Sequence, residues 1–218
     1  MDISINEHPL LDAVLLHTVW PQPLGEMETL ADLDDWFSVD AASPIEPIES
    51  LKTTVRDLLR HGGFKPSGRS KPASEYLLGA VAKGVMSSIN PAVDCCNVAS
   101  LHSGLPISVV DRHKGVGPWR IGLADTDTQY VFNPTGQVID ISGLVVLFDG
   151  NGPCGGPVKD SQRTKTHEGT TETLSVIWGT RQLAGRSQAT ADWYTGLMES
   201  LGAEVKEIRP AGPTDPHG

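Results

Sequence analysis

The sequence predicts an α+β fold in a single domain, and three observations lead to this class. Helix-like patterns come early in the chain and strand-like runs come late, an order that favours α+β over a doubly wound sheet. The length of 218 residues suits one domain of generous size or a core with an extension. The sequence shows no internal repeat, so a repeat architecture is not indicated.

The first fifty residues differ in character from the rest of the chain. Residues 10–20 are apolar and partly β-branched, which predicts a buried strand. Residues 21–49 combine four prolines with acidic residues, which predicts a loop with at most one short helix.

Four helices are predicted, each opened by a capping residue or a proline and closed by glycine: 50–62, 72–84, 90–104 and 187–202. Asn90-Pro91 gives the clearest start, because Asn caps free N–H groups and Pro suits the first helical position. Leaving His102 aside, Asp94 is the one charged residue of that helix, so we expect the helix to be buried on most sides.

In the second helix, the apolar spacing predicts that Leu77, Leu78 and Val81 point inward.

Strand-like runs separated by turn residues predict the rest of the fold. The predicted strands are 106–111, 119–124, 129–133, 138–148, 173–179 and 203–208.

The net charge of −10 is unevenly distributed along the chain. Residues 1–50 contain 11 acidic residues and no Lys or Arg, so the acidity belongs to this segment. We predict an acidic N-terminal segment (1–49) that packs on the core, a core (50–209) and a disordered tail (210–218). The core carries a local basic stretch that indicates either phosphate contacts or a solvated helix face: Lys52, Arg56, Arg60, Lys65, Arg69 and Lys71.

Composition and motifs exclude several classes of function. No run approaches the ~20 apolar residues of a membrane span, and the N-terminus lacks the features of a secretion signal, so we expect a cytoplasmic protein. The three cysteines form no Cys-x-x-Cys pattern, and no phosphate-binding loop, dinucleotide fingerprint or metal-ligand pair is present. We therefore predict neither a metal nor a cofactor.

The segment 160–166 carries seven polar or charged side chains directly after the Gly/Pro-rich run 150–157. A loop so rich in glycine buries little apolar area, and its N–H groups with Arg163 and Lys165 suit an anionic ligand. Asp160 and Ser161 are further candidates in this segment. The alternative is a solvated turn between two strands.

The buried helix supplies a second set of candidates. Asn90, Asp94 and Asn97 lie on one face at i, i+4 and i+7, and Ser100 lies beside Asn97. Buried polar groups need partners. They either tie down a neighbouring loop or form a pocket wall that binds a ligand's amino or hydroxyl groups.

The loop 63–70 supplies a third set. Lys65 and Arg69 are charged donors for a carboxylate or phosphate, and Ser67 can position a water molecule. The alternative is a plain connection between two helices.

Nucleophilic catalysis has little support in the sequence. Cys95 and Cys96 lie in an apolar helix and are expected to be buried structural thiols, whereas Cys154 is expected to be exposed. His102 and His167 are the acid–base candidates, although a lone histidine is commonly structural.

Three runs of the sequence, in this order, resemble a known family: GFKPSGRSKP, INPAVDCCNVASLHSGLPISVVD and KDSQRTKTHEGTTETLSVIWG. They look like the free-standing relatives of the B3/B4 domain of the phenylalanyl-tRNA synthetase beta subunit. The similarity spans roughly residues 10–208. It implies an α+β fold around a mostly antiparallel sheet, with a pocket between the helix 90–104 and the late strands.

In the synthetase, the domain that this chain resembles is an editing module that hydrolyses tyrosine wrongly attached to the phenylalanine tRNA. The resemblance places Asn97 on the Asn of the family's D-x-x-N helix motif, Ser108 on the family's His, and Asp160 near its pocket Glu. Ser108 cannot replace an imidazole as acid or base. Residues 155–158 (Gly-Gly-Pro-Val) stand where the relatives have aromatic residues, which implies a reshaped pocket.

These observations lead to three hypotheses of function. The first is an aminoacyl-tRNA deacylase with Asp160, Ser108 and His167 as catalytic candidates, and an amino acid or aminoacyl-tRNA as ligand. The second is a binding module without chemistry, and the third is an enzyme of secondary metabolism that acts on an amino-acid-derived metabolite. All of them require Arg163, Lys65 and Asn97 to converge on one polar hollow, and they leave the oligomeric state open.

Overall fold

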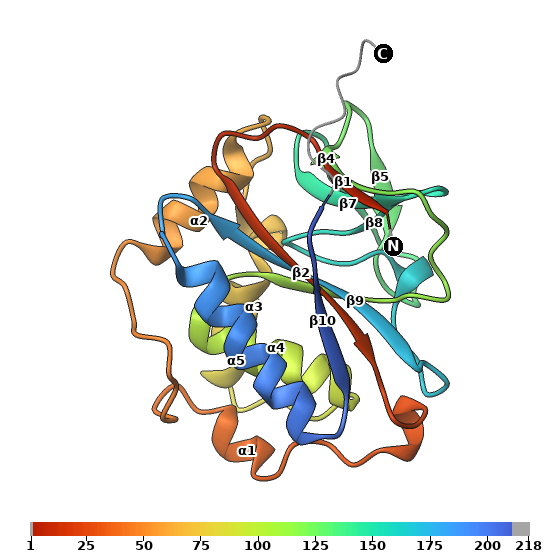
Figure 1. The fold of residues 1–218 in the computed structure, drawn as a ribbon. Helices are drawn as coiled ribbons and strands as arrows, with labels where there is room; N and C mark the ends of the chain where they lie inside the picture. Colours follow the sequence, from red (N-terminus) through yellow and green to blue (C-terminus); the bar gives the residue numbers. More distant parts are fainter. Residues whose placement is uncertain (1, 211–218) are drawn as a thin grey trace.

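Two four-stranded sheets and a group of helices form the α+β fold that the sequence predicts (Figure 1). The structure is a computed structural model that describes residues 2–210. The larger sheet has the order β10 (Glu204–Ile208), β2 (Leu11–Val19), β9 (Glu172–Thr180) and β3 (Ile107–Asp111). The smaller sheet has the order β1 (Ile3–Ile5), β4 (Trp119–Leu123), β7 (Val145–Asp149) and β8 (Gly152–Gly155).

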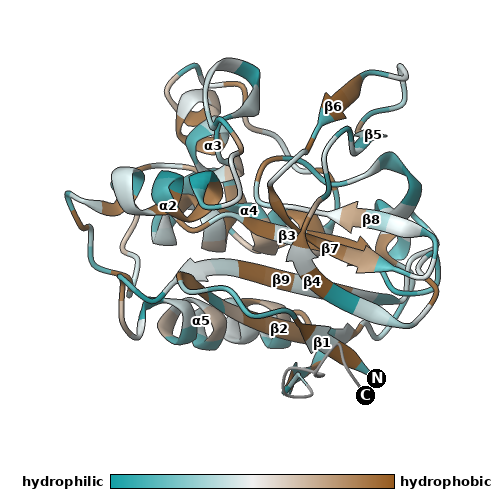
Figure 2. Ribbon diagram, turned by 90° about the horizontal axis from the view of Figure 1, so that it is seen from above, coloured by the Kyte–Doolittle hydropathy of each residue, from teal (hydrophilic) through white to brown (hydrophobic). Residues whose placement is uncertain are grey.

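The strands are mostly antiparallel. Within residues 2–210, β1 and β4 are the only strands that pair in parallel, and a separate hairpin joins β5 (Gln129–Val131) to β6 (Val138–Asp140). The longest ladder joins β2 to β9 over nine residue pairs, from Leu11↔Thr180 to Val19↔Glu172. Both strands are largely buried, because their apolar residues face the helices on one side and the smaller sheet on the other (Figure 2).

Five helices complete the described part of the chain: α1 (Leu33–Trp36), α2 (Leu51–Arg60), α3 (Ala73–Val81), α4 (Pro91–Ser103) and α5 (Arg186–Ser200). α5 packs on β2, β9 and β10 and lies beside α4, and α3 packs on α4 (Figure 1). Short 3-10 turns lie at Leu24–Glu26, Gly68–Ser70 and Gln162–Thr164.

α4 has the boundaries that the sequence predicts. The Asn90 side chain accepts a hydrogen bond from the N–H of Val93 at 3.1 Å, and Pro91 occupies the first turn. Gly104 ends the helix at φ +68°, a left-handed conformation that favours glycine. Ten of the thirteen residues of α4 are buried, as its low charge predicts.

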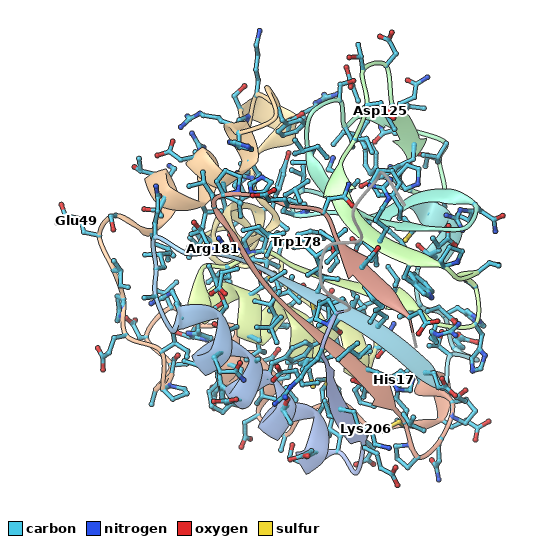
Figure 3. All side chains as sticks on the ribbon, turned by 45° about the horizontal axis from the view of Figure 1, so that its top comes forward. His17, Glu49, Asp125, Trp178, Arg181 and Lys206 are labelled. Atoms are coloured by element: carbon cyan, nitrogen blue, oxygen red, sulfur yellow. The ribbon has the colours of Figure 1, made fainter. Side chains whose placement is uncertain are left out.

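Residues 20–50 pack on the helical side of the molecule. The buried Arg186 donates hydrogen bonds to the carbonyl oxygens of Ser103 and Glu46, both at 2.8 Å. His102 Nε2 lies 2.9 Å from the carbonyl oxygen of Trp36. The acidic segment is thus tied to α4 and α5 by backbone carbonyls, while Glu46 and Glu49 are exposed and Glu49 points to solvent in Figure 3.

Several details differ from the sequence predictions. β1 and β8 were not predicted, because one has three residues and the other consists of Gly, Pro and Cys. The last helix starts at Arg186 with Gly185 as its N-cap, so Ser187 is not the cap. Leu78 is 44% exposed and does not point inward. The predicted disordered tail lies outside the described residues except for Pro210.

Among residues 2–210, no helix combines the length and the apolar character that crossing a membrane requires.

Candidate functional site

A cavity of about 270 Å³ lies between α3, α4 and the loop that follows β8, and we call it the α3–α4 cavity. Its volume is slightly below the range of drug-sized ligand pockets, so it suits a ligand as small as an amino acid. Apolar groups dominate its walls, with a few polar groups among them: Ala73, Tyr76, Leu77, Cys96, Asn97, Ser100, Ile107, Val158 and Lys159.

Asn97 and Ser100 supply the polar groups on the helix side of the cavity. Ser100 donates its hydroxyl hydrogen to the carbonyl oxygen of Leu105 at 2.8 Å, so a ligand meets the oxygen as an acceptor. The half-buried Asn97 makes no side-chain hydrogen bond with another described residue. Its amide can therefore both donate to and accept from a ligand.

Three cations lie on or near the residues that line this cavity, and we call Arg69, Lys71 and Lys159 the cationic rim. The Lys159 ammonium lies 3.7 Å from the ring centroid of Phe132 and 5.6 Å from that of Tyr76, and Lys71 lies 4.5 Å from the same Tyr76 ring. Burial lowers the pKa of Lys159, and the positive charges of Arg69 and Lys165 lower it further. Within residues 2–210 the rim forms no ion pair, so an anion would stabilise it.

Asp160 follows Lys159 directly, and its carboxylate is held by backbone donors. Oδ1 accepts from the N–H of Gly156 at 3.0 Å and Oδ2 from the N–H of Val109 at 3.3 Å. Burial raises the pKa of Asp160 to about 6, although the nearby Ser108 hydroxyl, these hydrogen bonds and the charge of Lys165 oppose the rise. The carboxylate also contributes to the raised pKa of Cys96, which lines the cavity.

Ser108 is completely buried beneath the same loop. Its hydroxyl donates to the carbonyl oxygen of Gly156 at 3.2 Å and accepts from the indole N–H of Trp178 at 2.9 Å. Trp178 lies in the interior of the molecule (Figure 3). Ser108 therefore fixes the loop that carries Asp160.

With this geometry in view, comparisons with known proteins identify the family. A sequence model of the B3/4 domain matches residues 65–191, more than half of the chain. The chain belongs to the B3/4 domain family. No curated protein matches the sequence.

A solved structure shares the fold of this B3/4 domain. It is an N-terminal fragment of the phenylalanyl-tRNA synthetase beta subunit from Pyrococcus horikoshii, with a TM-score of 0.52 and 8% sequence identity. The match covers 97% of this chain and 52% of the fragment, so this chain spans about half of the fragment's length. At this identity the likeness concerns the fold.

In this B3/4 domain the 160–166 segment turns most of its polar groups toward the protein. Arg163 forms two hydrogen bonds with the buried carboxylate of Asp149, at 2.7 and 2.8 Å. Burial alone would raise the pKa of Asp149, but Arg163 and the N–H groups of Val116 and Asn151 hold it below its ordinary value. Lys165 donates to the carbonyl oxygen of Phe132 at 2.6 Å.

Ser161 is also engaged locally, because its buried side chain accepts a hydrogen bond from the N–H of Arg163 at 3.4 Å. This B3/4 domain thus uses Ser161 and Arg163 to hold the segment in place. Of the segment 160–166, Asp160 lies closest in the chain to the cavity-lining Lys159.

Asp94 is buried away from the α3–α4 cavity and fully hydrogen-bonded. It accepts from the hydroxyls of Thr29 and Ser88, both at 2.6 Å, and from the N–H of Ile89 at 2.9 Å. These contacts correspond to the structural alternative in the sequence analysis, in which the helix ties down neighbouring loops.

The loop 63–70 lines a different hollow. Lys65 and Ser67 lie with Arg56, Arg60 and Phe64 around a volume of about 310 Å³. Arg69 is exposed and close enough to Lys159 to lower its pKa. The three predicted elements therefore meet only in part, since α4 shares one cavity with Val158 and Lys159, and Arg69 lies near Lys159.

The acid–base and thiol candidates lie elsewhere. The Nε2 atom of His167 lies 3.2 Å from the Oδ2 atom of Asp111, and its Nδ1 accepts from the N–H of Gly169 at 3.1 Å, so both nitrogens are engaged. The prediction of an exposed Cys154 was wrong. This thiol is fully buried, donates to the carbonyl oxygen of Leu147, and has a pKa raised by burial.

Sequence reasoning missed Tyr76 and Lys159 as cavity residues. Lys159 directly precedes the polar segment 160–166, so its position in the sequence could have indicated that it belongs to the site. Tyr76 gave none, because it lies in a helix whose apolar spacing suggested core packing only.

Proposed function

We propose that this B3/4 domain binds the aminoacyl end of a charged tRNA and hydrolyses its ester, with the amino-acid moiety in the α3–α4 cavity. The observation that carries this proposal is the combination of an amino-acid-sized cavity with unpaired cations on and near the residues that line it. Apolar walls hold a side chain, and Asn97 and Ser100 hold its polar atoms. The rim suits the phosphates of the RNA 3′ end.

Asp160 is the proposed general base. A pKa of about 6 leaves it mostly ionised at pH 7 while making it more basic than an ordinary aspartate. Its two backbone hydrogen bonds leave further lone pairs free to orient a water molecule. Ser108 acts through the loop rather than on the substrate, because both its donor and its acceptor roles are taken.

Family membership and the fold shared with a phenylalanyl-tRNA synthetase fragment agree with a charged-tRNA ligand. Arg163 and His167 carry no catalytic part in this proposal, because Asp149 and Asp111 engage them.

A second candidate is a binding module without chemistry. The observation that favours it is that none of the described histidines lines the α3–α4 cavity. In such a module the same residues hold an amino acid or aminoacyl ester, and nothing is hydrolysed. An amino-acid-derived metabolite is the ligand in the third hypothesis, and it would use the same cavity.

The test is release of amino acid from a panel of tRNAs, each charged with one labelled amino acid. Purified wild-type protein should accelerate release from at least one member. Asp160→Asn should slow this release at least about 100-fold, since general base catalysis contributes 10² to 10⁴. Asp140→Asn is the matched control, because Asp140 is exposed and bonds only Ser142.

The outcomes separate the candidates. Release that survives Asp160→Asn would remove Asp160 from the mechanism. No release from any tRNA, combined with calorimetric binding of an amino acid that Asn97→Leu abolishes, would leave the binding module. Neither release nor binding would refute both.

A further inference from the structure

An apolar groove lies between α2 and α3, and we call it the α2–α3 groove. It encloses about 230 Å³, which is room for an aliphatic side chain, and it shares no lining residue with the α3–α4 cavity. Leu78 is 44% exposed at this groove, although the rest of the apolar floor is better covered. The groove is lined by Leu51, Lys52, Val55, Lys71, Pro72, Ser74, Glu75, Leu78 and Gly104.

Two lysines give this groove a positive charge. The Lys52 ammonium lies 3.7 Å from the Glu75 carboxylate, but that carboxylate already accepts two hydrogen bonds of 2.7 Å from Arg56. Among the described residues Lys71 has no ion-pair partner. Both lysines can therefore still pair with carboxylates that come from outside the molecule.

Carboxylates lie next to the same groove, just before α2. Ile48 is 40% exposed, and its carbonyl oxygen accepts a hydrogen bond of 3.2 Å from the N–H of Leu51, which lines the groove. Glu46 and Glu49 flank Ile48, both are exposed, and Glu49 lies at the edge of the molecule (Figure 3). Neither carboxylate forms an ion pair within residues 2–210.

This combination of charges favours a second copy of the chain as the partner. RNA or an acidic peptide would be attracted by Lys52 but repelled by Glu46 and Glu49, and a basic partner would meet the opposite conflict. A surface that carries both signs beside an apolar groove is complementary to itself after a twofold rotation. The exposed Ile48 supplies the aliphatic side chain that the groove can hold.

We propose that the chain forms a closed, twofold symmetric dimer through the α2–α3 groove. Ile48 of each copy enters the groove of the other, and Glu49 of each copy pairs with Lys52 of the other. This dimer is independent of the proposed function, because no residue of the α3–α4 cavity takes part in it.

The first test is sedimentation equilibrium of the full chain over a range of concentrations. The apparent mass should rise from the 23.3 kDa of one chain to twice that value and then stay constant, because a twofold interface closes. Leu78→Asp places a charge in the apolar contact and should weaken dimerisation at least about tenfold. Val138→Asp is the matched control, because Val138 is equally accessible but lies on the β5–β6 hairpin.

The second test exchanges the charges. Glu49→Lys brings lysines face to face and Lys52→Glu does the same with carboxylates, so each variant alone should dimerise about tenfold more weakly, since every change acts twice in a symmetric dimer. An equimolar mixture of the two variants should regain the wild-type affinity, because both contacts of the mixed dimer again join opposite charges. Lys206→Glu, in β10, should have no effect.

Three results would overturn the proposal. The first is the mass of one chain at every concentration, and the second is a dimer that Leu78→Asp leaves intact. The third is an apparent mass that keeps growing beyond two chains, which an open, head-to-tail contact would give. A mixture of the charge variants that stays as weak as each variant alone would rule out the pairing of Glu49 with Lys52.

Discussion

At the scale of single residues, the proposed chemistry depends on the environment of Asp160. Burial raises the pKa of this carboxyl group, and the nearby Ser108 hydroxyl and hydrogen bonds from the N–H groups of Gly156 and Val109 lower it. Burial outweighs them, and the result is a pKa of about 6. When Asp160 is ionised, its buried charge destabilises the folded protein. Functional sites commonly lose stability in this way and gain a more basic group.

The free energy of unfolding should therefore depend on pH through Asp160. The folded-state pKa of Asp160 lies above its unfolded value near 3.8, so the folded state holds more protons between pH 4 and pH 6. The contribution of this group to the free energy of unfolding therefore falls as pH rises through that window. Urea denaturation of wild type and Asp160→Asn at pH 4, 5, 6 and 7 measures it.

We expect the difference in unfolding free energy, wild type minus Asp160→Asn, to decrease from pH 4 to pH 6 and then to level off. The comparison cancels other titrating groups, such as His8, whose pKa is lowered to about 4 by burial and by His61 and Arg181. A difference that stays flat or grows with pH would contradict the assigned pKa.

Arg163 gives a second prediction at this scale. Arg163→Ala leaves the buried Asp149 carboxylate without its charged partner, so the free energy of unfolding should fall by about 2 to 3 kcal/mol. Amino-acid affinity should stay at the wild-type value. Urea denaturation and calorimetry check the two parts, and a loss of affinity without a loss of stability would restore Arg163 to the binding site.

These residues also show what the sequence alone could not predict, namely the hydrogen-bond partners of polar side chains. The sequence shows an unusual concentration of polar groups in the 160–166 segment. The sequence did not indicate that Asp149 and Phe132 would satisfy Arg163 and Lys165, because those partners lie 14 and 33 positions away. Only the fold decides which polar groups remain free.

At the scale of helices and strands, the elements that local sequence signals define were predicted most reliably. α4 was predicted with its ends, because Asn90, Pro91 and Gly104 act through the helix's own backbone. β1 was missed, because a three-residue strand is defined by its pairing with β4, more than 110 positions later. β8 was missed, because glycine and proline are depleted in strands and read as loop.

Arg186 is one of the buried side chains that attach the acidic segment to the core. Arg186→Met removes hydrogen bonds to the carbonyl oxygens of Ser103 and Glu46 and leaves both acceptors unpaired. We expect a loss of about 2 to 4 kcal/mol in unfolding free energy. Residues 20–50 should also become susceptible to a glutamate-specific protease, which suits a segment without Lys or Arg.

Arg60→Met is the control for that experiment, because Arg60 is exposed and pairs only with Asp57. Equal protease resistance in wild type and Arg186→Met would show that Arg186 does not hold the segment.

At the scale of the whole molecule, charge is separated between two regions. All 11 acidic residues of the first fifty positions lie in a stretch without basic residues, whereas the cationic rim adjoins the α3–α4 cavity. In Figure 3, Glu49 lies at the edge of the molecule.

If the rim contacts RNA phosphates, the salt dependence of tRNA binding should report it. Replacing Lys159 or Arg69 with Gln should reduce the slope of log affinity against log salt by about 0.7 to 0.9 per residue. Lys206→Gln, in β10 on the far edge of the larger sheet, should leave the slope unchanged. Identical slopes for all variants would rule the rim out as the phosphate contact.

The order of helices and strands was sufficient to predict the fold class, since α+β follows from segregated elements. The expected meeting of three elements was realised only in part, because the Lys65 loop borders its own hollow and Arg163 turns to Asp149. Which loops face one another depends on how α3 and α4 pack, and no local pattern encodes that.

The nine-pair ladder between β2 and β9 restricts where this fold can be cut for fragments, fusions or chimaeras. The family match begins at residue 65, so a fragment cut at its limits would keep β9 and discard the strand that covers one of its edges. An open, apolar edge of that length invites self-association. Fusion partners or chimaeras built from this fold must therefore carry the N-terminal strand along, and exchange of the matched region alone should give insoluble material.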